Sequence, residues 1–358
     1  MIKVAFNIHP LKSAHKFRGV GKYTSELLKN LKYREDVEIL EFQDIKDAEK
    51  SDLVHFPFFD LFFHTLPNKF PKPAVVTIHD VIPLVFPKQH PVGIRGKINF
   101  FLQKRALKKC RAIITDSENS EKDIIKYLKI NESKIDVIPL AADNDFRVYS
   151  DSENFRMKRK YNLPDQFLLF VGDCNFEKNL PFLIKGFKAL KDLGFEDLKL
   201  ILINGVFLKK VENIDHPELE PLKKVNQLIK DYDLSNEVLR YGQLEVEDLV
   251  GFYNLATVYV QPSNYEGFGL PVLEAMKCGC PVACSNTSSL PEVGGAAVSY
   301  FDPANRKQFI EAITSLLQDK SLRNKLSSLG IIQAEKFSWT KTVDETIKVY
   351  LKVIKNGV

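Results

Sequence analysis

Long apolar runs and an excess of one charge are both missing from this sequence. No apolar stretch approaches the roughly 18 residues that a membrane span needs. The first ten residues, MIKVAFNIHP, lack the apolar core of a secretory signal and are typical of a first buried strand. Lysine and arginine outnumber aspartate and glutamate by only five, 51 against 46. These absences favour a cytoplasmic protein and give no reason to expect a nucleic acid partner.

Cysteine is also scarce, with five residues and no Cys-x-x-Cys pair. Their spacing fits no tetrahedral zinc site, and they lie within or beside apolar segments. Buried, reduced thiols in a cytoplasmic protein are the better explanation, so we expect no metal cofactor. The five are Cys110, Cys174, Cys278, Cys280 and Cys284.

Short apolar runs alternate with helical stretches along the whole chain, a pattern that predicts parallel sheets covered by helices. The 358 residues fit two such α/β domains, which we place at residues 1–160 and 161–337, because residues 143–165 are polar and lack a strand. A final helical segment, residues 338–358, starts with Ser338 as an N-cap and is expected to return to the first domain. The expected strands are Ile2–Ile8, Val37–Phe42, Leu53–Phe56, Ala74–Ile78, Ala112–Thr115, Ile135–Ile138, Phe167–Val171, Lys199–Ile203, Val238–Tyr241, Val258–Val260, Val282–Cys284 and Ala297–Tyr300, and the expected helices include Gly21–Leu31, Leu180–Leu190 and Leu270–Lys277.

The most informative segment is QPSNYEGFGLPVLEAMKCGC, which follows an expected strand. Ligands of open parallel sheets bind beyond the carboxyl ends of the strands. Glycines let the backbone approach a ligand, and a helix that begins near Leu270 presents N–H groups to an anion. The carboxylates of Glu266 and Glu274 would repel a phosphate but suit sugar hydroxyls. The segment therefore predicts a nucleotide-sugar pocket.

The stretch PSNYEGFGLPVLEAMKCGCPV resembles the signature of glycosyltransferase family 4, and the match extends through SNTSSLPEVGG. That family has the GT-B fold, two Rossmann-like doubly wound domains that face each other across a cleft, and its enzymes retain the anomeric configuration. By this resemblance Glu274 binds the ribose hydroxyls of the donor, and Glu266 holds hydroxyls of the donor sugar. The backbone of Gly267, Phe268, Gly269 and Leu270 would contact sugar or phosphate.

Two motifs of the first domain also resemble the family. In RGVGKYTSELLKNL, Gly19 and Gly21 correspond to a glycine loop near the donor phosphates or the acceptor. Alone, the GVG motif lacks the third glycine of a dinucleotide fingerprint, which disfavours a nicotinamide dehydrogenase. In VTIHDVIPLVFP, the resemblance places His79 near the reacting carbon, with Asp80 holding the loop. Ser117 is either a family serine at the acceptor side or a plain helix N-cap.

The segment LLFVGDCNFEKNLPFLIKGF resembles the loop that opens the second domain of the family. The resemblance implies that Lys178 supplies positive charge to the diphosphate leaving group and that Asn179 caps the next helix. Glu177 stands where the family commonly has arginine, and Asp173 stands where some relatives do, so the donor stays open. Two Asp-x-Asp patterns, at residues 143–145 and 231–233, match the metal motif of the other major glycosyltransferase fold, but such short patterns arise easily by chance.

Two neighbouring segments indicate either a membrane contact or ordinary packing. Residues 95–111 hold seven lysines and arginines and no acid, and Ile98, Phe101, Leu102 and Ala106 can share one helical face. Residues 56–63 contain five phenylalanines. A basic helix beside an aromatic loop suits the inner face of an anionic membrane, where lipid-linked acceptors lie.

The resemblance implies a retaining transferase that moves a hexose from GDP-mannose or a UDP-sugar to a saccharide or lipid-linked acceptor in cell-surface polysaccharide synthesis. A sugar-nucleotide epimerase or hydrolase on the same fold is an alternative, because fold does not determine the reaction. A non-catalytic subunit that binds sugar nucleotides is the other alternative, and Glu177 and Asp173 are its only support.

Overall fold

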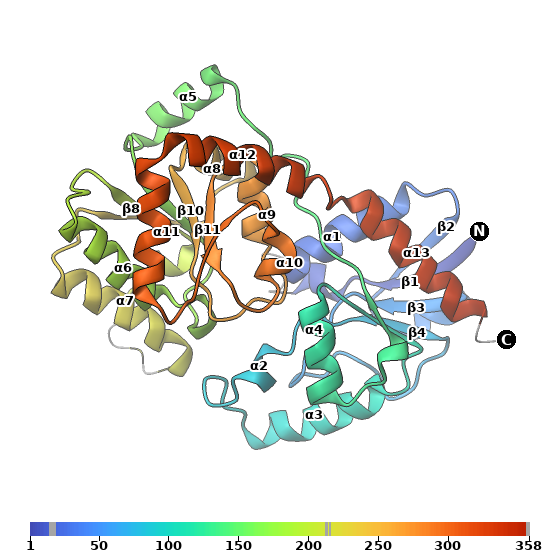
Figure 1. Ribbon diagram of the computed structural model, residues 1–358. Coiled ribbons are helices and arrows are strands. Elements are labelled where there is room, and N and C mark those ends of the chain that lie inside the picture. Colours follow the sequence, from blue (N-terminus) through green and yellow to red (C-terminus); the bar gives the residue numbers. More distant parts are fainter. Residues whose placement is uncertain (14–18, 212–213, 215, 356–358) are drawn as a thin grey trace. The chain divides into compact units, whose positions relative to one another are not determined.

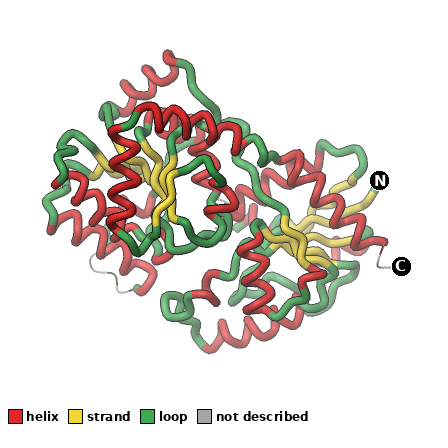
Figure 2. The backbone as a smooth tube through the Cα atoms, viewed as in Figure 1, coloured by secondary structure: helices red, strands yellow, loops and turns green. Residues whose placement is uncertain are grey.

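The computed structural model describes residues 1–13, 19–211, 214 and 216–355. The chain forms two compact units (Figure 1), of which the first comprises Met1–Ala141 with Phe337–Val358 and the second Ala142–Lys336. Each unit contains a parallel six-stranded sheet with helices on both faces (Figure 2). Each of the twelve strands expected from the sequence is present in the described residues, with ends that differ by at most two residues.

The first sheet has the strand order β2-β1-β3-β4-β5-β6. Its central strands are buried on both faces, which explains their unbroken runs of valine and isoleucine. Because all strands are parallel, their carboxyl ends share one edge, where loops can meet. The strands are β1 (Ile2–Asn7), β2 (Val37–Phe42), β3 (Leu53–Phe56), β4 (Ala74–Thr77), β5 (Ala112–Thr115) and β6 (Ile135–Val137), and the helices are α1 (Gly19–Lys32), α2 (Ile82–Val85), α3 (Ile94–Leu107), α4 (Glu118–Asp123) and α13 (Trp339–Lys355).

The second sheet has the strand order β12-β11-β10-β7-β8-β9. Strand β10 therefore lies between β7 and β11, and the loops that follow β7 and β10 start from adjacent strand ends. The strands are β7 (Phe167–Val171), β8 (Lys199–Ile203), β9 (Val238–Tyr241), β10 (Val258–Gln261), β11 (Val282–Ser285) and β12 (Ser299–Phe301), and the helices are α5 (Asp151–Tyr161), α6 (Leu180–Asp192), α7 (Glu220–Asp231), α8 (Val246–Leu255), α9 (Leu270–Lys277), α10 (Leu290–Gly294), α11 (Arg306–Gln318) and α12 (Lys320–Ala334).

Helix α5 occupies the polar stretch where the sequence-based division placed the end of the first domain. Ser150 and Glu153 form a capping box at its start. Arg156 pairs with Glu247 of α8 at 2.7 Å. Residues 142–160 consequently belong to the second unit, so the contact boundary lies nearer 141 than 160.

Helix α13 packs within the first unit, although it comes last in the sequence. The Ser338 hydroxyl accepts a hydrogen bond from the Lys341 N–H at 3.3 Å, which confirms the predicted N-cap. Thr342 donates to the Pro139 carbonyl oxygen at 2.8 Å. In the described part of the chain no helix is both long and apolar enough to span a membrane.

Candidate active site

The loop between β10 and α9 is held in one conformation by its neighbours. Gly269 has φ +105°, and a Cβ at this position would lie 2.8 Å from Leu290 Cδ2, so both backbone and space require glycine. The Ser289 hydroxyl lies 3.0 Å from the Glu266 carbonyl oxygen and 2.8 Å from that of Phe268, and it donates to both. Helix α9 begins at Leu270, as predicted. The loop therefore enters a helix N-terminus with a fixed geometry.

The Glu266 carboxylate is the centre of a buried polar cluster. Its two oxygens accept hydrogen bonds from Lys178 Nζ at 2.7 and 2.8 Å. Ser263 Oγ and Gln261 Nε2 donate to Oε1 at 2.6 and 2.8 Å. The Glu266 side chain is 8% exposed and that of Lys178 19%. Two residues for which the sequence predicted separate contacts with the donor are thus bound to each other here.

Glu274 lies in the middle of α9 and is also buried. Tyr253 of α8 donates its hydroxyl hydrogen to Glu274 Oε2 at 3.1 Å. Burial, together with the charge of Glu274, raises the pKa of Tyr253 well above its ordinary value, so this phenol stays a donor. The second predicted carboxylate therefore has a fixed orientation, and sequence reasoning did not identify its partner.

The loop after β7 places Lys178 next to Asn179. Asn179 has φ +55° and stands at the N-cap position of α6, but its side chain accepts no hydrogen bond from the helix. It donates instead to the carbonyl oxygens of Pro262 and Pro303, both at 3.2 Å. Asn179 thus stands at the predicted N-cap of α6, but its left-handed backbone turns the side-chain amide away from the helix and toward these two carbonyl oxygens.

The two acidic departures from the family pattern lie in different surroundings. Glu177 is buried, and its backbone carbonyl oxygen accepts from the Asn264 N–H at 2.7 Å. Asp173 is exposed, and its carboxylate accepts from the Cys174 N–H at 2.8 Å. Glu177 thus belongs to the packing between the β7 and β10 loops.

In the first unit, His79 and Asp116 follow the adjacent strands β4 and β5. His79 Nδ1 and Asp116 Oδ2 are 2.7 Å apart, with side chains that are 15% and 3% exposed. Burial by itself would lower the pKa of His79, but the Asp116 carboxylate, with smaller contributions from Asp80 and the Pro57 backbone, raises the net pKa. Burial raises the pKa of Asp116, and the His79 charge opposes this rise. The pair favours a charged imidazole. Sequence analysis did not identify Asp116 as a site residue, because nothing but its place before Ser117 marked it.

A buried chain of hydrogen bonds lies next to the His79 ring and contacts it through the ring of Tyr23. The Tyr23 ring packs edge-on against His79 at 4.7 Å between centroids, and its hydroxyl lies 3.1 Å from Thr77 Oγ1. Thr77 Oγ1 is 2.9 Å from His55 Nε2, and His55 Nδ1 is 2.6 Å from the Tyr350 hydroxyl of α13. Burial lowers the pKa of His55 to about 3, so this ring is neutral. The C-terminal helix is thereby linked to the position of His79.

The weaker site predictions for the first unit fall close to helix starts. Asp80 Oδ1 accepts from the Ile82 N–H at 3.0 Å and so holds the loop before α2. Ser117 is the N-cap of α4, since its hydroxyl accepts from the Ser120 N–H at 3.0 Å. Gly19 and Gly21 lie in the first turn of α1 rather than in a loop before it. Residues 14–18 of that motif lie outside the described residues.

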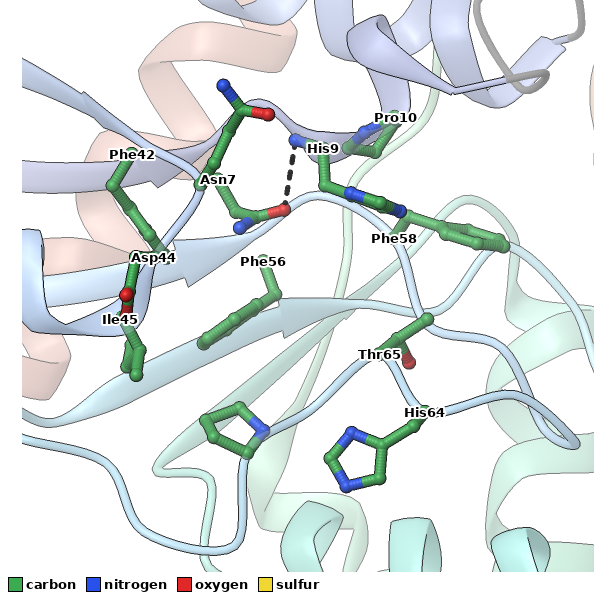
Figure 3. Close-up of a pocket in the computed structure, with 12 residues that line it drawn as sticks. Asn7, His9, Pro10, Phe42, Asp44, Ile45, Phe56, Phe58, His64 and Thr65 are labelled. Carbon is green, nitrogen blue, oxygen red and sulfur yellow. Dashed lines mark hydrogen bonds between the residues drawn. The ribbon is translucent and has the colours of Figure 1, made fainter.

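A pocket of about 450 Å³ lies at the carboxyl ends of β1, β2 and β3 (Figure 3). Its wall combines imidazole, carboxylate, amide and hydroxyl groups with aromatic rings, a mixture that suits the polar edges and apolar faces of a sugar. Asn7 Oδ1 accepts from the His9 N–H at 3.2 Å, and Asp44 accepts from the Lys46 N–H. Sequence reasoning missed this pocket. Its lining includes Asn7, His9, Asp44, Phe58, His64 and Thr65.

Metal-binding patterns and thiols form no cluster in the described residues. No three His, Cys, Asp or Glu side chains gather there as a ligand set. In one Asp-x-Asp pattern the Asp143 carboxylate accepts from the Asp145 N–H, and in the other Asp231 is the last residue of α7. All five cysteines are buried free thiols, as predicted. The expectation that no metal is needed stays a prediction.

Two family models match the chain: "Glycosyl transferases group 1" over residues 151–333 and "Glycosyltransferase Family 4" over residues 27–146. The serotype-specific mannosyltransferase WbdA of Escherichia coli is 30% identical over 291 residues, which cover 80% of this chain and 34% of WbdA. This chain thus matches about a third of that longer protein. The O-antigen chain mannosyltransferase B of Escherichia coli is 27% identical, over 98% of this chain and 99% of its own length.

The fold has close counterparts among solved structures. That of HepE from Anabaena in complex with UDP and glucose has a TM-score of 0.76 and 16% identity, with 98% of this chain and 100% of HepE covered. Each unit has the parallel α/β architecture of one domain of the GT-B fold. The chain therefore belongs to the family of group 1 glycosyl transferases.

Proposed function

We propose that this enzyme transfers a hexose from a nucleotide-diphosphate sugar to a saccharide or lipid-linked saccharide, with retention of the anomeric configuration, in cell-surface polysaccharide synthesis. The donor is GDP-mannose or a UDP-sugar. Similarity to the O-antigen mannosyltransferase over nearly both full lengths supports mannose and a polysaccharide acceptor. The complex of HepE, which has the same fold, with UDP and glucose supports the UDP-sugar as the second donor candidate.

The observation that carries the proposal is the Lys178–Glu266 pair beside the start of α9. Transfer builds negative charge on the departing diphosphate and positive charge on the sugar ring. When donor binds, Lys178 exchanges part of its contact with Glu266 for the diphosphate, and the backbone of residues 267–270 adds helix N-terminal stabilisation. Glu266 then accepts hydrogen bonds from the sugar hydroxyls, and Glu274 accepts them from the ribose.

On the acceptor side, His79 contributes a charged imidazole whose orientation Asp116 and Tyr23 determine. No side chain in this set is placed as a covalent nucleophile, so the proposed route to retention has the leaving phosphate oxygen take the acceptor proton on the same face. The pocket beyond β1, β2 and β3 is the proposed acceptor site, because its amide, imidazole and hydroxyl groups can bind sugar hydroxyls.

The proposed place of action is the cytoplasm at the inner face of the membrane, where lipid-linked acceptors are available. The membrane contact is assigned to residues 56–63 and 95–111. Of the five phenylalanines in the first segment, Phe56 and Phe59 are buried and Phe63 is 71% exposed.

The donor is tested by a thermal-shift panel of GDP-mannose, UDP-glucose and other nucleotide sugars, without added metal. A ligand present at 100 times its Kd stabilises the native state by about 2.7 kcal/mol, so the true donor should raise Tm clearly above the rest. The chosen donor is then incubated with and without oligosaccharide acceptors. Transfer only with acceptor, with the donor's anomeric configuration kept in the product, supports the proposal. Consumption of donor alone would favour the epimerase or hydrolase alternative, and no shift with any nucleotide sugar would refute the site.

A further inference from the structure

Four buried polar side chains form a continuous row within the first unit, between α13 and α1. The Tyr350 hydroxyl lies 2.6 Å from His55 Nδ1, and His55 Nε2 lies 2.9 Å from Thr77 Oγ1. Thr77 Oγ1 is in turn 3.1 Å from the Tyr23 hydroxyl. The four side chains come from α13, β3, β4 and α1, so the row joins four separate elements. We call Tyr350, His55, Thr77 and Tyr23 the buried row.

Every member of the buried row depends on its neighbours for a hydrogen-bond partner. Tyr23 is 3% exposed and the other three residues are 0% exposed, so water does not replace a lost partner. Burial, followed by the charge of His79, lowers the pKa of His55 to about 3, and the neutral ring can donate through one nitrogen and accept through the other. His55 thus serves Tyr350 and Thr77 at the same time. Loss of one hydroxyl leaves a buried polar group unpaired and loosens the rest of the row.

The buried row ends against the imidazole of His79. The Tyr23 ring packs edge-on against the His79 ring, with 4.7 Å between the centroids and 84° between the planes. Asp116 Oδ2 lies 2.7 Å from His79 Nδ1. One hydrogen bond fixes one atom of the imidazole but still allows the ring to tilt about it. The edge-on contact with Tyr23 restricts this tilt, so the two contacts together define the orientation of the imidazole.

The buried row brings no charge to His79. Burial, followed by the charge of Asp116, raises the pKa of Tyr23, so this phenol keeps its proton. The low pKa of His55 keeps that ring uncharged. Asp116 and Asp80 face His79 with their charges, and both favour the imidazolium. The buried row therefore acts on His79 through position and not through charge.

We infer that the buried row positions the His79 imidazole for glycosyl transfer, so that Tyr350 on the last helix affects turnover. This inference rests on the role of His79 in the proposed function. The row holds the Tyr23 ring in place, and the ring in turn holds the imidazole at its contact with Asp116. A catalytic group that is displaced by about 1 Å can cost about 100-fold in rate. Residues that never touch the substrate can therefore lower kcat when they are changed.

Two substitutions of Thr77 separate hydrogen bonding from packing. Thr77→Val keeps nearly the same shape and removes the hydroxyl, whereas Thr77→Ser keeps the hydroxyl and removes a methyl group. We expect kcat to fall about tenfold in Thr77→Val and to stay within about twofold of wild type in Thr77→Ser. Donor Kd should stay within about twofold in both variants, because the proposed ribose and diphosphate contacts lie in the second unit. A row that only packs the core would give lower Tm without a change in kcat.

A double-mutant cycle tests whether the buried row acts through His79. Tyr350→Phe alone should lower kcat by about tenfold. The same substitution added to His79→Asn should change kcat by no more than about twofold, because the imidazole that it positions is already gone. The control Tyr161→Phe removes a phenol hydroxyl that donates to Asp248 Oδ2 at 2.8 Å in the second unit, and it should keep wild-type kcat. All rates are compared at a temperature at which each variant is folded.

A readout without turnover is the proton NMR signal of the His79 ring, which is identified by its loss in His79→Asn. The signal should shift in Thr77→Val and Tyr350→Phe and stay in place in Thr77→Ser and Tyr161→Phe. If His79→Asn transfers at the wild-type rate, the proposed role of His79 is refuted together with this inference. If His79→Asn is impaired but Thr77→Val and Tyr350→Phe keep both kcat and the signal, or if Tyr350→Phe lowers kcat equally without His79, only the inference is overturned.

Discussion

At the scale of single residues, the candidate donor site consists of two carboxylates in different electrostatic states. Glu266 is neutralised by Lys178, whereas Glu274 accepts from the neutral phenol of Tyr253. Glu266 can exchange its hydrogen bonds with Lys178 for hydrogen bonds with a ligand. Glu274, which the Tyr253 hydroxyl holds in place, is already oriented to accept hydrogen bonds from ligand hydroxyl groups. Substitution of the two glutamates should therefore affect different quantities, donor affinity for Glu274 and turnover for Glu266.

For Glu274→Ala we expect donor Kd to rise by about 10- to 100-fold, because hydrogen bonds to a charged group are lost. For Glu266→Gln we expect donor affinity within a few-fold of wild type and kcat lower by about 100-fold, since electrostatic support is lost mainly in the transition state. Calorimetric titration and initial rates separate the two effects. Glu311→Ala, an exposed carboxylate on α11, is the control. Wild-type values for both site variants would remove these residues from the site.

The His79–Asp116 pair makes stability depend on pH in a defined direction. The folded-state pKa of His79 is raised above its ordinary 6.5, so its stabilising contribution is present below 6.5 and is lost as the pH rises through the raised value. Asp116→Asn removes this contribution. We therefore expect urea unfolding to show wild type more stable than the variant by about 1–3 kcal/mol near pH 6.

The same experiment near pH 9 should show a smaller difference between wild type and Asp116→Asn. The titration of the His79 ring, followed by proton NMR, should move to lower pH in the variant. A stability difference that grows as the pH rises, or an unchanged His79 titration, would contradict the assigned role of Asp116.

Gly269 tests the shape of the donor loop. Alanine at φ +105° is strained, and its Cβ would meet Leu290 Cδ2 at 2.8 Å, so Gly269→Ala should destabilise the fold by about 1–3 kcal/mol and weaken donor binding. Gly205→Ala is the control, because a Cβ there has no atom within 4 Å. Chemical denaturation of both variants checks this. Equal stability of the two would show that the loop tolerates a side chain.

At the scale of whole elements, α13 connects the end of the chain to the candidate site through Tyr350 and His55. Tyr350→Phe leaves a buried imidazole nitrogen without its hydroxyl partner, which should cost about 1–3 kcal/mol. Leu351→Ala, at a 42% exposed position one residue away, should change little. Thermal unfolding compares the two. If Tyr350→Phe proved as stable as Leu351→Ala, the hydrogen bond between Tyr350 and His55 would not contribute to the stability of the fold.

Regular elements could be predicted from the sequence because their signals are local. Buried parallel strands such as Ala112–Thr115 appear as short runs of apolar, mostly branched residues between polar stretches. Helix α5 was missed, although Ser150 and Glu153 carry a capping-box signature. The predicted shared face of Ile98, Phe101 and Ala106 in α3 is wrong, because Ala106 is buried whereas Ile98 and Phe101 are exposed. The buried face also holds Gln103, whose Oε1 accepts hydrogen bonds from the N–H groups of residues 65 and 66, and no local pattern indicates these bonds.

The part of the candidate site that lies within one short segment could be predicted from the sequence. Glu266, Gly269 and Glu274 lie within nine residues, and the motif is recognisable in one dimension. The partners Asp116 and Tyr253 lie on other elements and become neighbours only after folding. The pocket beyond β1, β2 and β3 is formed by residues of three separate loops, so no single stretch of sequence could predict it.

At the scale of the whole molecule, the proposal assigns the donor to the second unit and the acceptor to the first, two units of the same architecture. In the proposed donor site Lys178 and a helix N-terminus stabilise the diphosphate, so we predict that transfer needs no metal. Removal of divalent ions with EDTA should therefore leave donor Kd and transfer rate unchanged within about twofold. Titration with and without chelator checks this. A loss of activity that Mn²⁺ or Mg²⁺ restores would show that an ion shares the role of Lys178.

The most direct test is a crystal structure of the full chain with its nucleotide sugar bound. The account predicts ribose hydroxyls within hydrogen-bond distance of the Glu274 carboxylate, diphosphate oxygens at Lys178 Nζ and the start of α9, and sugar hydroxyls at Glu266. A nucleotide bound elsewhere, with the Lys178–Glu266 pair and the α9 N-terminus untouched, would contradict it.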